Sequence, residues 1–105
     1  MRRGEVWWAE LPSPVGRRPV VLLSRDAAYS VRTSVTVGIV TRVVRNIPVE
    51  VALGPEDGLP KQCVANLDEI ITIPKTRLSE RITGLSPQKM TAVAGAIMFA
   101  LDLKV

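Results

Sequence analysis

The sequence predicts a small, mainly β protein with α: an SH3-like barrel of strongly bent strands with a C-terminal helix across one end. Three observations lead to this prediction. The chain has 105 residues, the usual size of one domain, so residues 1–105 are expected to form a single domain. Five or six short β-rich runs, separated by turn residues, occupy roughly the first 80 positions. Only near the C-terminus do apolar residues recur at helical spacing.

The first half of the chain is expected to contain three strands. Prolines and a glycine end the first strand, and the second strand is apolar on both faces, which indicates burial. The expected elements are a strand at 5–11, a loop at 12–16, a strand at 18–24, a polar segment at 25–33 with one helical turn at 26–29, a strand at 35–41 and a basic connector at 42–46.

The clearest alternation follows, at residues 47–53. It places Ile47, Val49, Val51 and Leu53 on one side, and Pro48 favours an edge position because proline cannot donate a ladder hydrogen bond. A turn cluster at 54–58 leads to a long or broken strand at 62–73.

The last element is a helix. Ser86 is a good N-cap and Pro87 suits the first helical position. The residues expected on its apolar face are Met90, Val93, Ala94, Ile97 and Leu101.

The positive charge is concentrated in the first half. Net charge is +4, and residues 1–50 hold eight arginines against four acids, while the remainder is balanced at six against six. Arginine suits bidentate phosphate contacts and stacking on bases, so this distribution favours nucleic-acid binding. The alternative is a solvated surface with a slight positive bias.

Composition also indicates where the protein is located and whether it forms subunit contacts. No apolar run approaches the roughly 18 residues of a membrane span, and no signal-peptide pattern begins the chain, so a cytoplasmic protein is expected. A hydrophobic content of 47% suggests that some surface is buried between subunits. The single Cys63 lies in an apolar stretch and is expected to be a buried structural thiol.

The chain has no histidine, which excludes a Ser-His-Asp triad, a Cys-His pair and a histidine metal cluster. The adjacent acids Glu56-Asp57 and Asp68-Glu69 are better explained as a turn and a sheet margin than as a metal site. No metal and no cofactor are therefore expected, and catalysis would depend on arginine, hydroxyls, acids or backbone amides.

Several segments resemble, in order and spacing, the MazF/PemK (Kid-like) toxin family of toxin–antitoxin systems. They are Arg2-Arg3-Gly4-Glu5-Val6-Trp7-Trp8-Ala9-Glu10-Leu11, Arg17-Arg18-Pro19-Val20-Val21-Leu22-Leu23-Ser24, Ile39-Val40-Thr41, Gly58-Leu59-Pro60-Lys61, Asn66-Leu67-Asp68-Glu69-Ile70-Ile71-Thr72-Ile73-Pro74 and Gly84-Leu85-Ser86. Each motif alone is weak, but together they cover nearly the whole chain.

The resemblance implies an SH3-like barrel of the MazF/CcdB type that forms a homodimer and cleaves single-stranded RNA at short motifs. The target is mRNA, with tRNA and rRNA left open. The family's reactive pair corresponds to Arg18 and Thr41, and the implied reaction is metal-independent attack of a ribose 2'-OH on its own 3'-phosphate. An antitoxin with a flexible C-terminal segment would compete with RNA, and the basic first half suggests that this segment is acidic.

Physical chemistry limits the roles of this pair. The guanidinium of Arg18 is always charged, so it suits a clamp on the developing phosphorane better than a general base. Thr41 can donate a hydrogen bond that fixes in-line geometry. The base is not evident; Asp68 and Glu10 are candidates. One branch of the family uses an arginine and an aspartate, at positions that are Asn66 and Asp68 here, so that mechanism is in doubt.

RNA contacts are expected from arginines and tryptophans around this pair. Trp7 and Trp8 should point to opposite faces of the first strand, the outward one being a dimer contact or a stacking platform. Sequence readout is expected from the loops at 12–17 and 42–46. The candidate RNA-binding residues are Arg17, Arg25, Arg42, Arg45, Trp7 and Trp8.

Two rival functions remain. Gyrase poisons resemble the same fold but depend on a tryptophan near the C-terminus, which residues 101–105 lack. A non-catalytic barrel that only binds nucleic acid is the other.

Overall fold

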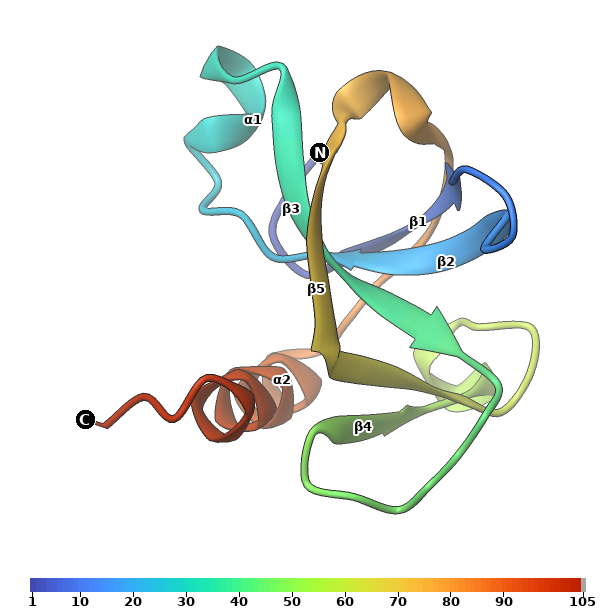
Figure 1. Ribbon diagram of the computed structural model, residues 1–105, viewed down its shortest axis with the longest axis vertical. Coiled ribbons are helices and arrows are strands. Elements are labelled where there is room, and N and C mark those ends of the chain that lie inside the picture. Colours follow the sequence, from blue (N-terminus) through green and yellow to red (C-terminus); the bar gives the residue numbers. More distant parts are fainter. Residues whose placement is uncertain (105) are drawn as a thin grey trace.

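The computed structural model describes residues 1–104 as one strongly bent antiparallel sheet with a helix packed beside it (Figure 1). The strands lie in the order β4-β5-β3-β2-β1-β6. The elements are β1 Glu5–Glu10, β2 Arg17–Leu22, α1 Ala28–Val31, β3 Ser34–Thr41, β4 Glu50–Leu53, the 3-10 turn η1 Pro55–Asp57, β5 Cys63–Pro74, the 3-10 turn η2 Lys75–Arg77, β6 Leu78–Gly84 and α2 Pro87–Ala100.

The predicted fold class is confirmed in the form of a half-barrel. The edge strands β4 and β6 stand at opposite ends of the strand order, so the sheet curves without closing. None of the helices within residues 1–104 is long and apolar enough to cross a membrane.

The strand β5 bends because its pairing with β3 shifts register. Gly38 pairs with Ile70, whereas Ile39 pairs with Asn66, so residues 67–69 form a bulge. Before the bulge β5 pairs with both β3 and β4, and after it with β3 alone. A bulge bends a strand and increases its twist, which allows one strand to serve both halves of the sheet. The sequence was compatible with either a long or a broken strand. The structure has one long strand that contains a bulge.

The core consists of two clusters on the two sides of the bent sheet. The first contains Val6, Val40, Leu53 and Leu67, against which Val93 of α2 is completely buried. The second joins β1, β2 and β3 around Leu22 and Val37, together with Tyr29 of α1 and Trp7. Cys63 is buried in the first cluster, as predicted. Burial raises the pKa of its thiol, and the nearby charges of Asp57 and Glu56 raise it further.

The C-terminal helix begins as the sequence predicted. Ser86 is the N-cap and its side chain accepts a hydrogen bond from the Lys89 amide at 3.1 Å, with Pro87 at the start of the helix. Met90 and Ile97 pack against the first cluster. The prediction that Leu101 lies on the apolar face of this helix is wrong, because the helix ends at Ala100 and Leu101 is 56% exposed.

Two further expectations need correction, and one strand was not predicted. Residues 47–49 lie outside β4 and Ile47 is exposed, because β4 begins only where Glu50 pairs with Asn66. The helical turn expected at 26–29 lies at Ala28–Val31. The strand β6 was not predicted, since most of its residues are exposed and it has no alternating apolar face.

Candidate functional site

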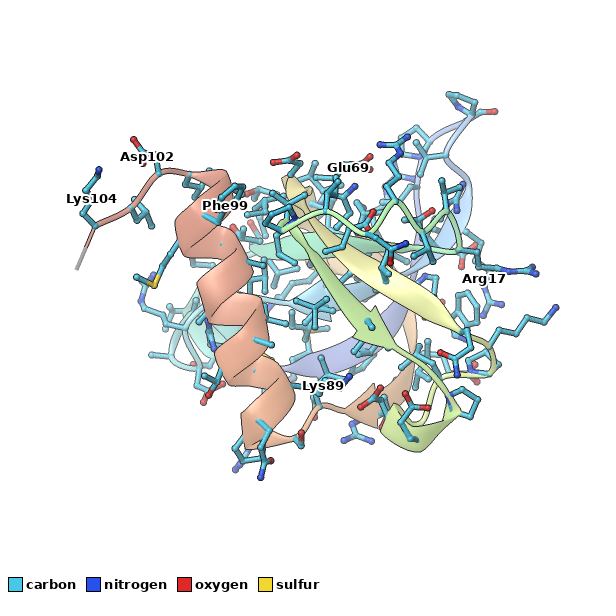
Figure 2. The ribbon with its side chains drawn as sticks, turned by 90° about the horizontal axis from the view of Figure 1, so that it is seen from below. Arg17, Glu69, Lys89, Phe99, Asp102 and Lys104 are labelled. Atoms are coloured by element: carbon cyan, nitrogen blue, oxygen red, sulfur yellow. The ribbon has the colours of Figure 1, made fainter. Side chains whose placement is uncertain are left out.

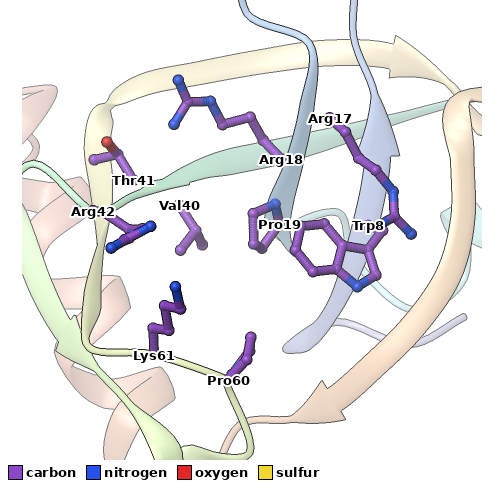
Figure 3. Close-up of a pocket in the computed structure, with 9 residues that line it drawn as sticks. All are labelled: Trp8, Arg17, Arg18, Pro19, Val40, Thr41, Arg42, Pro60 and Lys61. Carbon is purple, nitrogen blue, oxygen red and sulfur yellow. The ribbon is translucent and has the colours of Figure 1, made fainter.

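A cavity of about 320 Å³ opens where β2 begins, β3 ends and the turn before β5 passes. Figure 3 shows the side chains that line it, and Figure 2 shows Arg17 on the side of the molecule away from α2. The lining residues are Trp8, Arg17, Arg18, Pro19, Val40, Thr41, Arg42, Pro60 and Lys61.

The structure brings Arg18 and Thr41 to this one cavity. The antiparallel register of β2 and β3 pairs Val20 with Ile39. Continuing that register by two residues on each strand sets Arg18 opposite Thr41, on the same level of the two strands. Sheet pairing therefore explains why two residues 23 positions apart in sequence share one site.

Local hydrogen bonds orient both side chains. The Arg18 Nε donates to the carbonyl of Val15 at 3.3 Å, and within the described residues 1–104 the two terminal nitrogens of the guanidinium make no hydrogen bond, so they can bind an anion. The Thr41 hydroxyl accepts the amide of Val43 at 3.2 Å, so its own proton remains available for donation. Both residues are partly buried. They can therefore present two kinds of donor to one phosphate.

Trp8 is the tryptophan that lines the cavity, and Arg17 covers its ring. The guanidinium of Arg17 lies 4.3 Å from the ring centroid, a cation–π contact. Arg17 is also ion-paired with Glu10 at 2.9 Å and, more weakly, with Glu80 at 3.9 Å. Arg17 thus lines the cavity, but its charge is already compensated.

Three other cations at the cavity have no such compensation. Within residues 1–104, Arg18, Arg42 and Lys61 make no ion pair, and no carboxylate lines the cavity. Unpaired like charges repel, so holding three of them around one cavity costs free energy that an anionic ligand would recover. The electrostatics of the site therefore favour a phosphate-rich ligand.

Lys61 and Pro60 are site residues that the sequence reasoning missed. They belong to the motif Gly58-Leu59-Pro60-Lys61, which was noted as a family feature without a role. The turn that carries them is not adjacent in sequence to β2 or β3, so only the fold places it at the cavity.

Five other candidate residues lie outside the cavity lining. Arg25 and Arg45 are exposed away from it, and the carboxylate of Glu50 instead accepts the Arg45 amide. The exposed Asp68 lies in the β5 bulge, where its amide donates to Asn66 Oδ1 at 2.9 Å. The others are Glu10, which binds Arg17, and Trp7.

Trp7 faces away from the cavity and lies on the other side of β1, where it packs against the second core cluster. Its Nε1 donates to Glu5 Oε1 at 3.0 Å, and Arg81 Nε pairs with Glu5 Oε2 at 3.1 Å. Burial alone would raise the pKa of Glu5, but the hydrogen bonds from Trp7, Arg81 and the Arg2 amide together bring it below its ordinary value. The two tryptophans therefore face opposite ways, as predicted.

Residues 2–101 match the model of the PemK-like, MazF-like toxins of type II toxin–antitoxin systems. The chain belongs to this toxin family. The family resemblance noted in the sequence is thereby confirmed, and with it the toxin class of the chain.

Relatives of this MazF-like toxin are similar along most of their length. It is 39% identical to the probable endoribonuclease MazF5 of Mycobacterium tuberculosis over 101 residues, covering 95% of the chain and 92% of the relative. It is 42% identical to the probable endoribonuclease MazF2 of the same species, covering 86% and 87%.

Solved structures give the same result for the fold. The M. tuberculosis toxin MazF-mt6 matches with a TM-score of 0.89 and 33% identity, over 96% of this chain and 99% of that one. An endoribonuclease in complex with its cognate antitoxin, from a mycobacterial species, matches with a TM-score of 0.88 and 30% identity, over 100% and 98%.

Proposed function

We propose that this toxin is a metal-independent endoribonuclease that cuts single-stranded RNA, and that the cavity around Arg18 and Thr41 is where it cuts. One observation carries the proposal: three unpaired cations and a threonine hydroxyl surround one cavity that no carboxylate lines in residues 1–104. The names of the relatives, probable endoribonucleases, support RNA cleavage.

In the proposed reaction the 2'-oxygen of a ribose attacks its own 3'-phosphorus. A new P–O2' bond forms and the P–O5' bond breaks, leaving a 2',3'-cyclic phosphate and a 5'-OH end. Arg18 stabilises the charge that develops on the non-bridging oxygens, and Thr41 holds one of them in line. Charge stabilisation at a preorganised site is the main catalytic effect of such groups.

The protons follow from the groups that are present. The 2'-OH proton passes to water, because neither histidine nor a cavity-lining carboxylate is available in residues 1–104. The leaving 5'-oxygen takes a proton from water or from the guanidinium of Arg18. Glu10 and Asp68 are not needed as bases in this scheme, since Glu10 is bound to Arg17 and Asp68 lies outside the cavity.

A homodimer and an antitoxin complete the proposal. Phe99, Leu101 and Leu103 are 62%, 56% and 53% exposed at the end of α2, an apolar surface that a second subunit would cover. Sedimentation of a monomer at working concentration would contradict the dimer. The antitoxin would place an acidic flexible segment on the unpaired cations.

The proposal is tested by incubating purified toxin with single-stranded RNA in EDTA. We expect discrete cuts that EDTA does not prevent. RNA that is bound but uncut would favour a non-catalytic barrel, and inhibition of DNA gyrase without RNA cleavage would favour a gyrase poison. A requirement for a divalent metal would refute the mechanism.

A further inference from the structure

The cavity has two chemically different sides. Figure 3 shows the side chains of Arg42 and Lys61 on one side, below Thr41. It shows Pro19, Pro60 and Trp8 on the other. A nucleotide has the same two parts, a charged phosphate and a flat apolar base. At about 320 Å³ the cavity is at the small end of ligand sites, which suits one nucleotide.

The backbone just before Lys61 is held in place, while its ammonium group makes no ion pair within residues 1–104. The amide of Gly58 donates to Pro55 at 3.0 Å, and the Thr83 hydroxyl of β6 donates to the Asp57 carbonyl at 2.9 Å. Leu59 is only 3% exposed and packs in the first core cluster. An anchored turn holds the start of the lysine side chain in place, so only the side chain itself must be ordered when it contacts an anion.

The ring of Trp8 is also held in place. Arg17 covers the ring, and Glu10 restrains Arg17 through the 2.9 Å ion pair. In Figure 3, Pro19 lies beside the edge of the indole. The ring therefore forms a fixed wall of the cavity, and its apolar surface is suited to stack a base of any identity.

We infer that Lys61 and Trp8 form a nucleotide subsite beside the cut bond, with Lys61 binding a phosphate next to the scissile one and Trp8 stacking a base. The position beside the cut bond rests on the proposed function, whereas the binding itself does not. Lys61 and Trp8 are binding and positioning residues. They supply affinity for the RNA strand, and Arg18 acts on the reacting phosphate.

A binding experiment with single-stranded DNA isolates the subsite, because DNA lacks the 2'-OH that the reaction needs. Trp7→Phe leaves Trp8 as the one tryptophan, since the sequence has two. We expect a short mixed-sequence DNA strand to change the Trp8 fluorescence on binding. Fluorescence that does not respond while DNA binds, as followed by anisotropy of a labelled strand, would overturn the role of Trp8.

The salt dependence of the same binding tests Lys61. Each phosphate contact to a single strand contributes about 0.7 to the slope of log affinity against log salt, so Lys61→Ala should lower the slope by that amount. Lys61→Arg should retain it. Lys104→Ala removes an equal charge from the exposed C-terminal segment and is the matched control. Equal slopes for Lys61→Ala and Lys104→Ala would overturn the role of Lys61.

Base stacking is tested by two substitutions at one position. Trp8→Ala should weaken DNA binding about 5- to 100-fold, the usual range for loss of one stacking platform, and Trp8→Phe should restore most of it. Circular dichroism checks that both variants fold. Equal affinities for folded Trp8→Ala and Trp8→Phe would contradict stacking.

Cleavage kinetics separate this inference from the proposed function. With RNA, Lys61→Ala should raise KM and change kcat little. If the toxin binds DNA as described and cuts no RNA, the subsite stands and the nuclease proposal fails. If Lys61→Ala and Trp8→Ala cut RNA with unchanged KM, the subsite is refuted and the nuclease proposal stands.

Discussion

The neighbouring tryptophans of β1, Trp7 and Trp8, belong to two regions that differ in whether their charged side chains are paired within the chain. Around Trp7, Glu5 is only partly exposed and accepts hydrogen bonds from Trp7, Arg81 and the Arg2 amide. The cavity that Trp8 lines holds three cations with no ion pair within residues 1–104: Arg18, Arg42 and Lys61. Charges that are satisfied within the chain stabilise the fold, whereas charges left unpaired at a cavity are available to a ligand. We therefore expect the Trp7 region to contribute to the stability of the fold and the Trp8 region to contribute to ligand binding.

The largest effect is expected in the Trp8 region. Arg18→Ala should lower kcat/KM for RNA cleavage by at least about a hundredfold, the usual loss when one donor to a developing oxyanion is removed. Its free energy of unfolding should change little, because within residues 1–104 the Arg18 side chain makes one hydrogen bond, to Val15. Cleavage assays and urea unfolding of the same preparation check both. Cleavage at near wild-type rate would remove Arg18 from the mechanism.

The antitoxin should also act on the unpaired cations. An acidic segment would be attracted by Arg18, Arg42 and Lys61, so its association rate should fall at least about tenfold as salt rises from about 50 to 500 mM, because ions screen exposed charges. Stopped-flow measurement of the cognate antitoxin peptide tests this. A rate independent of salt would show that the segment binds elsewhere or by apolar contacts alone.

In the Trp7 region the expected effect is on stability. Glu5→Gln should lower the free energy of unfolding by about 1–2 kcal/mol, because it weakens hydrogen bonds between charged groups. Glu69→Gln removes an exposed carboxylate in the β5 bulge and is the control. Cleavage by the folded Glu5→Gln protein should stay near the wild-type rate.

The pH dependence of the Glu5 contribution has a definite sign. The pKa of Glu5 is lower in the folded protein than its ordinary value of 4.5. Its stabilisation is therefore present above that value and is lost as pH falls through the lower, folded pKa. Unfolding curves should converge for wild type and Glu5→Gln in acid. A constant difference down to the lowest pH would refute the assignment.

The smallest effect is expected at Tyr29 of α1. The Tyr29 hydroxyl donates to the Ser24 carbonyl at 3.0 Å, and burial with the nearby Asp26 charge raises its pKa to about 12. Tyr29→Phe should cost about 1 kcal/mol at neutral pH. The wild-type protein should lose more stability than Tyr29→Phe as pH rises from 10 toward 12, which unfolding curves of both at alkaline pH can check.

The sequence predicted most elements that have strong periodicity, although residues 47–49 of the clearest alternation lie outside β4, and it missed elements that depend on tertiary contacts. The N-cap at Ser86 and the buried second strand are local patterns, and the structure has both. β6 was missed because its side chains are mostly exposed and its place is set by pairing with β1. The bulge in β5 depends on the register against β3, which no local pattern encodes.

The same division holds for the site. Arg18 and Thr41 were predicted from the family resemblance, Arg42 from its charge and Trp8 from its place on the first strand, and all four line one cavity. Lys61 was missed because its turn reaches the cavity only through the fold. Arg25 and Arg45 were proposed because of their charge, and charge alone does not tell which surface an arginine faces.

The central claim is that the unpaired cations of the Trp8 region stabilise a phosphate under attack by its own 2'-OH. An RNA with a single 2'-deoxy nucleotide on the 5' side of one mapped cut site tests it most directly, with cleavage at that site and affinity measured together in EDTA. The account predicts unchanged affinity and no cleavage at that linkage, with a 2',3'-cyclic phosphate at the unmodified sites. Cleavage at the deoxy linkage would contradict it.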